Sequence, residues 1–260
     1  ITKKIGVIGC GNMGGAILYG ALESGVLPKE NVYVYDINPV MMEKAKGWGV
    51  NLAKDDEDVC LSSDIILLAV KPQNAAEALS QCKKALDEKA MMSIVAGVTV
   101  ERLRNMIDGT PRILRLLPNT PAMVGEGVLL FEEENTLTSE EHQQIVELFR
   151  SVGLVKELPS RLMGIGGTVT GCGPAFVDLM IEAYGDAAVK YGLQRQDAYV
   201  LISQMILGSA KLQLVSGQHP GQLKDNVCSP AGTTIRGVTA LEEQGFRNAC
   251  IKSIDAIMNK

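Results

Sequence analysis

The sequence contains few of the residues that build metal or redox sites. Its only histidines are His142 and His219, and neither lies at metal-ligand spacing from another ligand. His142 stands in a charged run that predicts a solvated helix face, and His219 precedes a proline in a turn, so neither is our candidate acid or base. The six cysteines form no Cys-x-x-Cys pair: Cys10, Cys60, Cys82, Cys172, Cys228 and Cys250. We therefore expect no metal site and no disulfide framework, but reduced, mostly buried thiols.

The sequence also has no excess of positive charge, since it contains 25 Lys and Arg but 30 Asp and Glu, which gives a net charge of -5. Neutralising phosphates or anionic lipids requires clustered basic residues, so we expect no nucleic-acid or membrane partner. The longest nearly continuous apolar stretch, residues 198–210, is too short as it stands to cross a bilayer, and we interpret it as a buried helix. No secretion signal precedes it, which favours a cytoplasmic protein.

The first half of the chain has short apolar runs rich in Val, Ile and Leu, with room for a helix between most of them. They are Ile5–Ile8, Val32–Tyr35, Ile65–Val70, Met91–Val95, Ile113–Leu117 and Val128–Phe131. Continuous apolar runs are typical of a parallel sheet that is covered on both faces. Residues 1–159 are therefore predicted to form a Rossmann-like, doubly wound α/β domain.

After Pro159 the pattern changes to long helical segments broken by Gly and Pro. They are Pro174–Tyr191, Arg195–Val215, Pro230–Gln244 and Phe246–Met258. Residues 160–260 are predicted to form an all-α domain. Its helix from Arg195 is apolar nearly all round, more than a domain of about 100 residues can hide. We expect a homodimer or larger assembly built on this domain; the alternative is a central helix buried within its own bundle.

The motif Gly9-Cys10-Gly11-Asn12-Met13-Gly14 follows a predicted strand and opens a predicted helix. In that context Gly9 permits the tight turn, Gly11 lets the pyrophosphate approach the backbone, and Gly14 allows the helix to pack closely on the strand. The helix N-terminus then faces the anion. A compact turn without a ligand is the alternative, which the flanking strand and helix disfavour.

Asp36 ends the second predicted strand, about 20 residues past the glycine turn, where an acid hydrogen-bonds the ribose 2′-hydroxyl. A carboxylate there repels a 2′-phosphate, and the nearest following cation is Lys44, so we hypothesise a preference for NADH over NADPH. Three further loops follow predicted strands at the same edge. They are residues 70–73, 96–97 and 118–121. Lys71, in the first of them, is interpreted either as a ligand of phosphate or ribose or as a solvated loop cation.

A second motif, residues 224–235, has the composition of a turn that enters a helix. Small residues before a helix leave backbone N–H groups free, and Ser and Thr hydroxyls add donors, which suits a small carboxylate. A helix start capped by Ser229 and Pro230 explains the same residues equally well. Both interpretations stay open on the residues alone.

Through these and further motifs, the chain resembles the pyrroline-5-carboxylate reductases over nearly its whole length. The matching blocks are residues 8–14, 69–72, 118–121, 171–176, 219–223 and 229–235. The resemblance implies NAD(P)H-dependent reduction of the ring C=N of 1-pyrroline-5-carboxylate to L-proline, the last step of proline biosynthesis. It also implies an interwoven dimer of helical domains, and in many members a decamer of five dimers.

The resemblance also implies roles for individual residues. The substrate carboxylate rests on Ser229, Gly232 and Thr233, the Thr234 hydroxyl hydrogen-bonds the ring nitrogen as the candidate catalytic group, and Asn226 lines the pocket. The positions that contact the nucleotide are Cys10, Asn12, Met13, Val70, Lys71, Pro72 and Ala96, besides the glycines of the turn.

The chain departs from the family pattern at three positions: Cys172 replaces Ser, Ala231 replaces Gly, and Asp56 replaces an Asn near the adenosine ribose. The first two exchange small residues and change little. The resemblance implies NADPH as the usual hydride donor, but Asp56 adds negative charge to that of Asp36 and strengthens the hypothesis that this chain prefers NADH. Ser160 stands where several relatives carry an acid, so that role is not carried over.

No obvious acid stands in the substrate motif, so we expect the imine to bind protonated, or to be protonated through water, while Thr234 orients it. A β-hydroxyacid dehydrogenase has the same layout but requires a lysine shortly after a glycine-rich turn, where this chain has residues 174–178 without one. A nucleotide-sensing protein without chemistry is a further alternative, and the complete turn through Thr234 argues against it.

Overall fold

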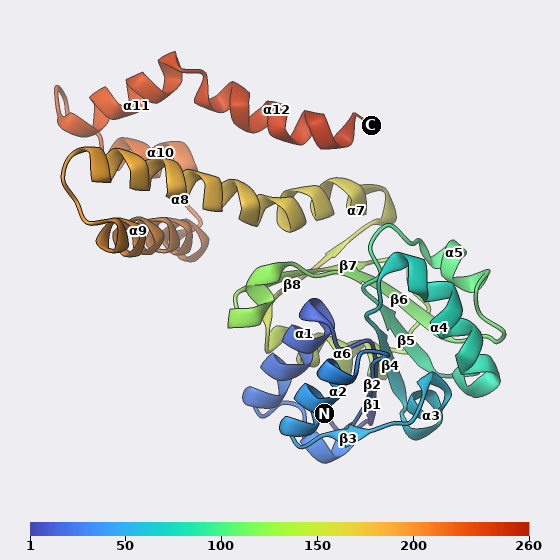
Figure 1. Ribbon diagram of the computed structural model, residues 1–260. Helices are drawn as coiled ribbons and strands as arrows, with labels where there is room; N and C mark the ends of the chain where they lie inside the picture. Colours follow the sequence, from blue (N-terminus) through green and yellow to red (C-terminus); the bar gives the residue numbers. More distant parts are fainter. Residues whose placement is uncertain (260) are drawn as a thin grey trace. The chain divides into compact units, whose positions relative to one another are not determined.

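The computed structural model describes residues 1–259, which fold as two compact units, residues 1–171 and residues 172–259 (Figure 1). We call them the N-terminal and the C-terminal unit. The N-terminal unit is built around one sheet whose strands are β1 (Ile5–Ile8), β2 (Val32–Tyr35), β3 (Asn51–Leu52), β4 (Ile65–Leu68), β5 (Ala90–Ser93), β6 (Arg112–Leu117), β7 (Gly127–Glu132) and β8 (Gly153–Leu158).

The sheet has the order β3-β2-β1-β4-β5-β6-β7-β8, and every neighbouring pair is parallel except β6 and β7. After β3 the chain crosses back past β1 to form β4, so the strand order reverses beside β1. Open α/β sheets bind their ligands at such a reversal, beyond the carboxyl ends of the strands.

Helices cover both faces of this sheet. They are α1 (Asn12–Glu23), α2 (Pro39–Gly47), α3 (Asp56–Ser62), α4 (Ala75–Cys82), α5 (Val100–Arg104), α6 (Ser139–Arg150) and α7 (Ser160–Gly167), with short 3-10 turns η1 (Lys29–Asn31), η2 (Pro72–Asn74), η3 (Lys83–Leu86) and η4 (Thr120–Val124). One buried cluster joins α1 and α6 to the sheet and a second joins α3 and α4 to its other face. The predicted doubly wound α/β domain is confirmed.

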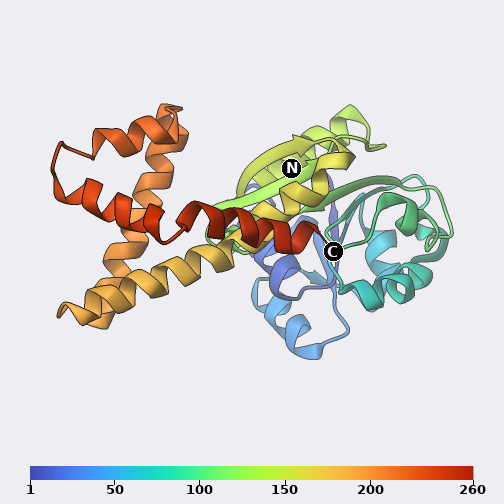
Figure 2. The same ribbon diagram turned by 90° about the horizontal axis from the view of Figure 1, so that it is seen from above.

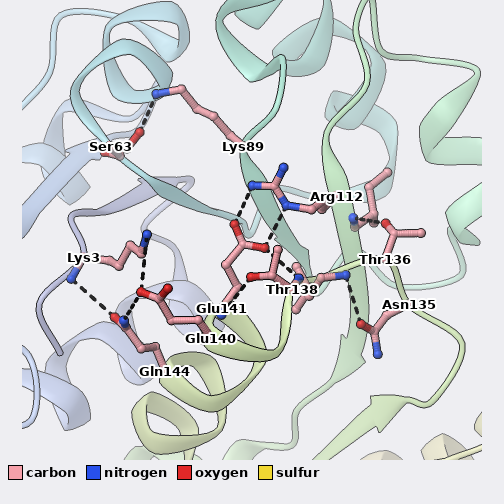
Figure 3. Close-up of polar contacts among 12 residues, drawn as sticks. Lys3, Ser63, Lys89, Arg112, Asn135, Thr136, Thr138, Glu140, Glu141 and Gln144 are labelled. Carbon is pink, nitrogen blue, oxygen red and sulfur yellow. Dashed lines mark hydrogen bonds and ion pairs between the residues drawn. The ribbon is translucent and has the colours of Figure 1, made fainter.

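The start of α6 is fixed to the sheet by polar contacts (Figure 3). Thr138 and Glu141 form a reciprocal capping box, and Arg112 of β6 binds the Glu141 carboxylate through two nitrogens at 2.5 and 2.8 Å. The bound guanidinium keeps the pKa of Glu141 below its ordinary value. The Thr136 hydroxyl also accepts a hydrogen bond from the Ile113 N–H, which holds the connection before α6 against β6.

The C-terminal unit is helical, as predicted (Figure 2). A π-helical segment, η5 (Thr168–Cys172), leads into α8 (Gly173–Lys190), followed by α9 (Arg195–Ser216), α10 (Pro220–Asn226), α11 (Thr233–Glu243) and α12 (Phe246–Met258). α9 packs along α8 and α12 packs against α11. The predicted helix Pro230–Gln244 is wrong at its start, because Ala231 has a left-handed φ of 56° and helical geometry begins only at Thr233.

The expected burial of residues 198–210 is also wrong for the single chain. Ala198 is the one buried residue of α9, and apolar side chains such as Val200, Leu207 and Leu214 are more than half exposed. The alternative of a helix buried within its own bundle therefore fails, since α8 covers only one side of it. Two helical stretches in the described residues, 160–190 and Arg195–Ser216, are long and apolar enough to span a membrane by length and composition. An apolar face exposed in one chain equally suits contact with a second chain.

Two smaller expectations also change. Cys10, Cys60 and Cys82 are buried as predicted, but Cys172 and Cys228 are half-buried and Cys250 is exposed, because they lie in the less compact C-terminal unit. His142 is not a freely solvated residue of α6. Its ring packs edge-on against Phe131, and its Nε2 lies 3.1 Å from the Glu157 carboxylate.

Candidate nucleotide site and carboxylate turn

The glycine turn between β1 and α1 uses each glycine differently. Gly9 has a φ of 90°, and a Cβ there would lie 2.8 Å from the Ala69 carbonyl oxygen. A Cβ at Gly14 would lie 2.5 Å from the Gly9 carbonyl oxygen, so helix and turn touch. A Cβ at Gly11, in contrast, would meet no described atom within 4 Å, which leaves open space beside the backbone there. This is the pattern that close approach of a pyrophosphate requires.

α1 begins at Asn12 with Gly11 as its N-cap, and no side chain caps it. The first N–H groups of a helix have no partner within the helix, and without a side-chain cap they remain donors for an anion. Asn12 is exposed and Met13 half-buried, whereas Cys10 is fully buried. Burial, with the nearby Asp36 charge, raises the pKa of the Cys10 thiol to about 11, so this thiol stays protonated and neutral.

Asp36 is bound to the glycine turn, a contact that sequence reasoning missed. One carboxylate oxygen accepts the Cys10 N–H at 2.6 Å, and the other accepts the Asn38 N–H at 2.8 Å. Both bonds hold the carboxylate at the end of β2, and each oxygen keeps a second lone pair for a further donor. The charge predicted to meet the ribose is therefore fixed in place beside the turn.

Asp56 is the first residue of α3 and is only 4% exposed. Its pKa is raised to about 6, mainly because burial disfavours the charged form, and further by the carboxylates of Asp55, Asp36 and Glu77. α3 packs against β1 and β2, the two strands that carry the glycine turn and Asp36. The sequence indicated Asp56 as a second acid near Asp36, but the burial of Asp56 could not be predicted from the sequence.

The remaining predicted nucleotide residues follow strands that end level with β1. Ile8 pairs with Leu68, and Leu68 pairs with Ser93, so the loops after β1, β4 and β5 leave the same edge of the sheet. These loops hold Val70, which is half-buried, and the exposed residues Lys71, Pro72 and Ala96. The N-terminal unit thus gathers the predicted nucleotide residues at one edge of the sheet.

The predicted substrate residues lie in the C-terminal unit, around the turn between α10 and α11. Asn226 ends α10, and its side-chain oxygen accepts a hydrogen bond from Gln222 at 2.9 Å. Gly232 is the N-cap of α11, without a side-chain cap, and its N–H donates to the Ser229 carbonyl at 3.0 Å. Thr233 and Thr234 are exposed in the first helical turn. Ser229 does not cap this helix, which removes the capping explanation and leaves the first N–H groups of α11 available.

Comparison with known proteins matches both units. Residues 160–260 match the family model described as pyrroline-5-carboxylate reductase dimerisation, and residues 4–97 match the model described as NADP oxidoreductase, coenzyme F420-dependent. The pyrroline-5-carboxylate reductase of Escherichia coli is 40% identical, over 100% of this chain and 97% of its own length. That of Methanosarcina acetivorans is 38% identical over 97% of this chain and 94% of its own.

The chain belongs to the pyrroline-5-carboxylate reductase family. Solved structures agree. The Coxiella burnetii pyrroline-5-carboxylate reductase superposes with a TM-score of 0.92 at 30% identity, covering 100% of this chain and 97% of that one. The Plasmodium falciparum pyrroline carboxylate reductase, solved with NADP bound, has a TM-score of 0.88 at 33% identity, covering 98% and 95%. The predicted family and fold are confirmed, and the β-hydroxyacid dehydrogenase alternative is excluded.

The reductase family model starts at residue 160, whereas the compact units divide after Gly171. The two boundaries differ because α7 lies within the residues that the family model matches, yet it packs on β7 and β8 of the N-terminal unit.

Proposed function

We propose that this chain uses NAD(P)H to reduce the C=N bond of 1-pyrroline-5-carboxylate to L-proline, the last step of proline biosynthesis. The observation that carries the proposal is the 40% identity to the Escherichia coli reductase along the whole chain. Residues 1–159 serve as the dinucleotide-binding domain, and residues 160–260 serve as the substrate-binding and dimerisation domain.

The nucleotide is held at the edge where the glycine turn and Asp36 meet. The open space beside Gly11 and the uncapped start of α1 fit a pyrophosphate, with Gly9 and Gly14 shaping the turn. The other contacts come from Cys10, Asn12, Met13, Val70, Lys71, Pro72 and Ala96. Asp36 is anchored by two N–H groups beside the ribose, and Asp56 adds negative charge when ionised, so NADH is the preferred donor.

The substrate carboxylate binds the turn before α11. Ser229 and Thr233 supply hydroxyl donors, and Gly232 and the uncapped N–H groups of α11 supply the rest. Asn226 lines the same pocket. A carboxylate held by two or three charge-assisted bonds of about 1.5–3 kcal/mol each is selected over a ring without it by about a hundredfold or more.

The reduction delivers a hydride to the ring carbon while the ring nitrogen holds a proton. NAD(P)H supplies the hydride when bound. The Thr234 hydroxyl hydrogen-bonds the nitrogen and orients the ring, while the proton comes with the substrate or through water, because a threonine hydroxyl is a poor acid. The protein's contribution is then mainly positioning.

The assembly that we propose is a homodimer through the helical domain, and five such dimers in a decamer are the larger assembly that the family resemblance implies. The exposed apolar residues of α9 support contact with a second copy. We further propose a cytoplasmic location, with neither nucleic acid nor membrane as a partner.

The test is oxidation of NADH or NADPH on addition of pyrroline-5-carboxylate, with proline identified as the product. Thr234→Ala is the informative variant and Thr239→Ala, on the same helix, is its control. Proline formation that falls with Thr234→Ala alone supports the proposal. Nucleotide binding without any proline formation would instead favour a nucleotide sensor, and full activity of Thr234→Ala would remove the role of its hydroxyl.

A further inference from the structure

The side chain of Asn119 joins three segments of the N-terminal unit. Asn119 lies in the loop after β6 and is 7% exposed. Its Oδ1 accepts the Val128 N–H at 2.8 Å, at the start of β7, and its Nδ2 donates to the Thr170 carbonyl at 3.0 Å, in η5. An N–H can only donate and a carbonyl can only accept, so these partners fix the orientation of the amide.

The Asn119 bond reaches a carbonyl in a segment where helical pairing changes. η5 is a π-helical segment, whose carbonyls pair five residues on instead of four, and such single turns inside α-helices are frequent at functional sites. Pro174, in the first turn of α8, has no N–H to donate to the carbonyls before it. The Thr170 carbonyl accepts from the Asn119 Nδ2, and the Thr170 hydroxyl donates to the Gly166 carbonyl at 3.0 Å.

The helix before η5 is pressed onto the sheet. A Cβ at Gly166 would lie 2.7 Å from Leu158 and 2.9 Å from Leu130, and one at Gly167 would lie 2.8 Å from Leu117. α7 therefore packs so closely on β6, β7 and β8 that these leucine side chains would have to move to admit a Cβ at either glycine. Its end is fixed by packing, and the segment that follows it is fixed by Asn119.

The loop that holds Asn119 lies at the nucleotide edge. β5 and β6 are parallel, so residues 118–121 leave the same side of the sheet as the glycine turn. The loop continues into η4, which packs on α1, the helix that the glycine turn opens. Asn119 thus connects the surroundings of the nucleotide to the segment that leads to the C-terminal unit.

We propose that Asn119 is a positioning residue for hydride transfer. It holds the loop at the nucleotide edge in one fixed arrangement with η5, the segment after which the chain continues to the substrate turn. Residues 172–260 carry that turn and continue directly from the segment that Asn119 binds. The inference rests on the proposed function, and Asn119 itself touches neither the substrate nor the nucleotide in this role.

Asn119→Asp tests this with minimal change in shape. The variant keeps the oxygen that accepts from Val128 but places a second oxygen against the Thr170 carbonyl. Asn135→Asp is the matched control, because the Asn135 amide also braces a loop through backbone groups, donating to Glu133 at 3.1 Å and accepting from Leu137 at 3.2 Å (Figure 3). Both of these partners lie in the loop before α6 and not in η5.

We expect Asn119→Asp to lower kcat by about tenfold to a hundredfold, as misplaced reactants do, with the Kd of NADH within about twofold of the parent. In single turnovers, the primary isotope effect with NADH deuterated at the transferred position should rise. Asn135→Asp should leave kcat, the Kd of NADH and the isotope effect unchanged. A kcat loss with an unchanged isotope effect, or an equal loss in both variants, would mean a merely structural role and overturn the inference.

Hydrogen exchange gives a readout that does not depend on activity. Amides of residues 168–172 should exchange faster in Asn119→Asp than in Asn135→Asp, whether or not pyrroline-5-carboxylate is turned over. Unchanged exchange there overturns the inference even if the reductase activity is found. Absence of activity in the unsubstituted protein would refute the proposed function alone.

Discussion

Replacing Asp56 by asparagine should stabilise the protein at neutral pH. The carboxyl is 4% exposed, and its pKa is raised from an ordinary 3.8 to about 6, mainly by burial and then by Asp55, Asp36 and Glu77. When a carboxyl binds its proton more tightly in the folded protein than in the unfolded chain, its ionisation destabilises the folded protein. The loss is absent below about pH 4, grows as the pH rises to about 6, and is complete above it.

The size of the effect follows from the two pKa values. At about 1.4 kcal/mol per pKa unit, ionised Asp56 costs at most about 3 kcal/mol at neutral pH. Asp56→Asn removes the charge with little change in shape. The free energy of unfolding, from urea titrations, should therefore rise by up to about 3 kcal/mol at about pH 7.5, and the gain should shrink toward zero at about pH 3.5.

Asp108→Asn, which changes an exposed aspartate, is the control and should give no comparable gain. The same Asp56→Asn protein should use NADPH better relative to NADH, by about tenfold, because the variant removes one negative charge from the site that we propose for the ribose. A destabilised Asp56→Asn protein, or a gain that does not depend on pH, would refute the description of Asp56 as a buried carboxylate among like charges.

Three further predictions concern stability and binding. Gly9→Ala should lose several kcal/mol of unfolding free energy, because its φ of 90° and a nearby carbonyl exclude a Cβ, whereas Gly11→Ala should keep its stability and lose NADH affinity in titration calorimetry. Ala231→Gly should raise the unfolding free energy by about 1 kcal/mol by relieving a left-handed φ of 56°, and a loss instead would contradict the strain. Arg112→Ala should cost about 2–3 kcal/mol at neutral pH by stranding the buried Glu141 carboxylate. The pKa of Glu141 is lowered in the folded protein, so the loss of unfolding free energy in Arg112→Ala should fade as the pH drops below the ordinary pKa of a glutamate. A loss that persists in acid would contradict the ion pair.

Strands with continuous apolar runs could be predicted from the sequence, since every residue of β1 and β4 is buried and must be apolar. β3 and β8 could not. β3 is two exposed residues, and β8 has only exposed and half-buried residues at the far edge of the sheet. A search for continuous runs therefore passes over both.

The features of the site also divide into those that could be predicted from the sequence and those that could not. The glycine turn could be predicted because each glycine meets a local steric demand, and α12 because its ends are marked by Gly245 and by the end of its apolar pattern. The bond between Asp36 and Cys10, the burial of Asp56 and the contact of Asn119 with Thr170 could not, because each depends on the register and packing of segments far apart in the sequence. The exposed apolar face of α9 was seen in the sequence only as apolar composition, which does not say what covers it.

The central claim is that the glycine turn binds the hydride donor while the turn from Ser229 to Thr234 recognises the carboxylate of the substrate. The most direct test compares kcat/KM for pyrroline-5-carboxylate and for unsubstituted 1-pyrroline, with NADH in excess and the product identified. We expect proline as the product and a preference of about a hundredfold or more for the carboxylated ring. Equal turnover of the two rings would contradict it.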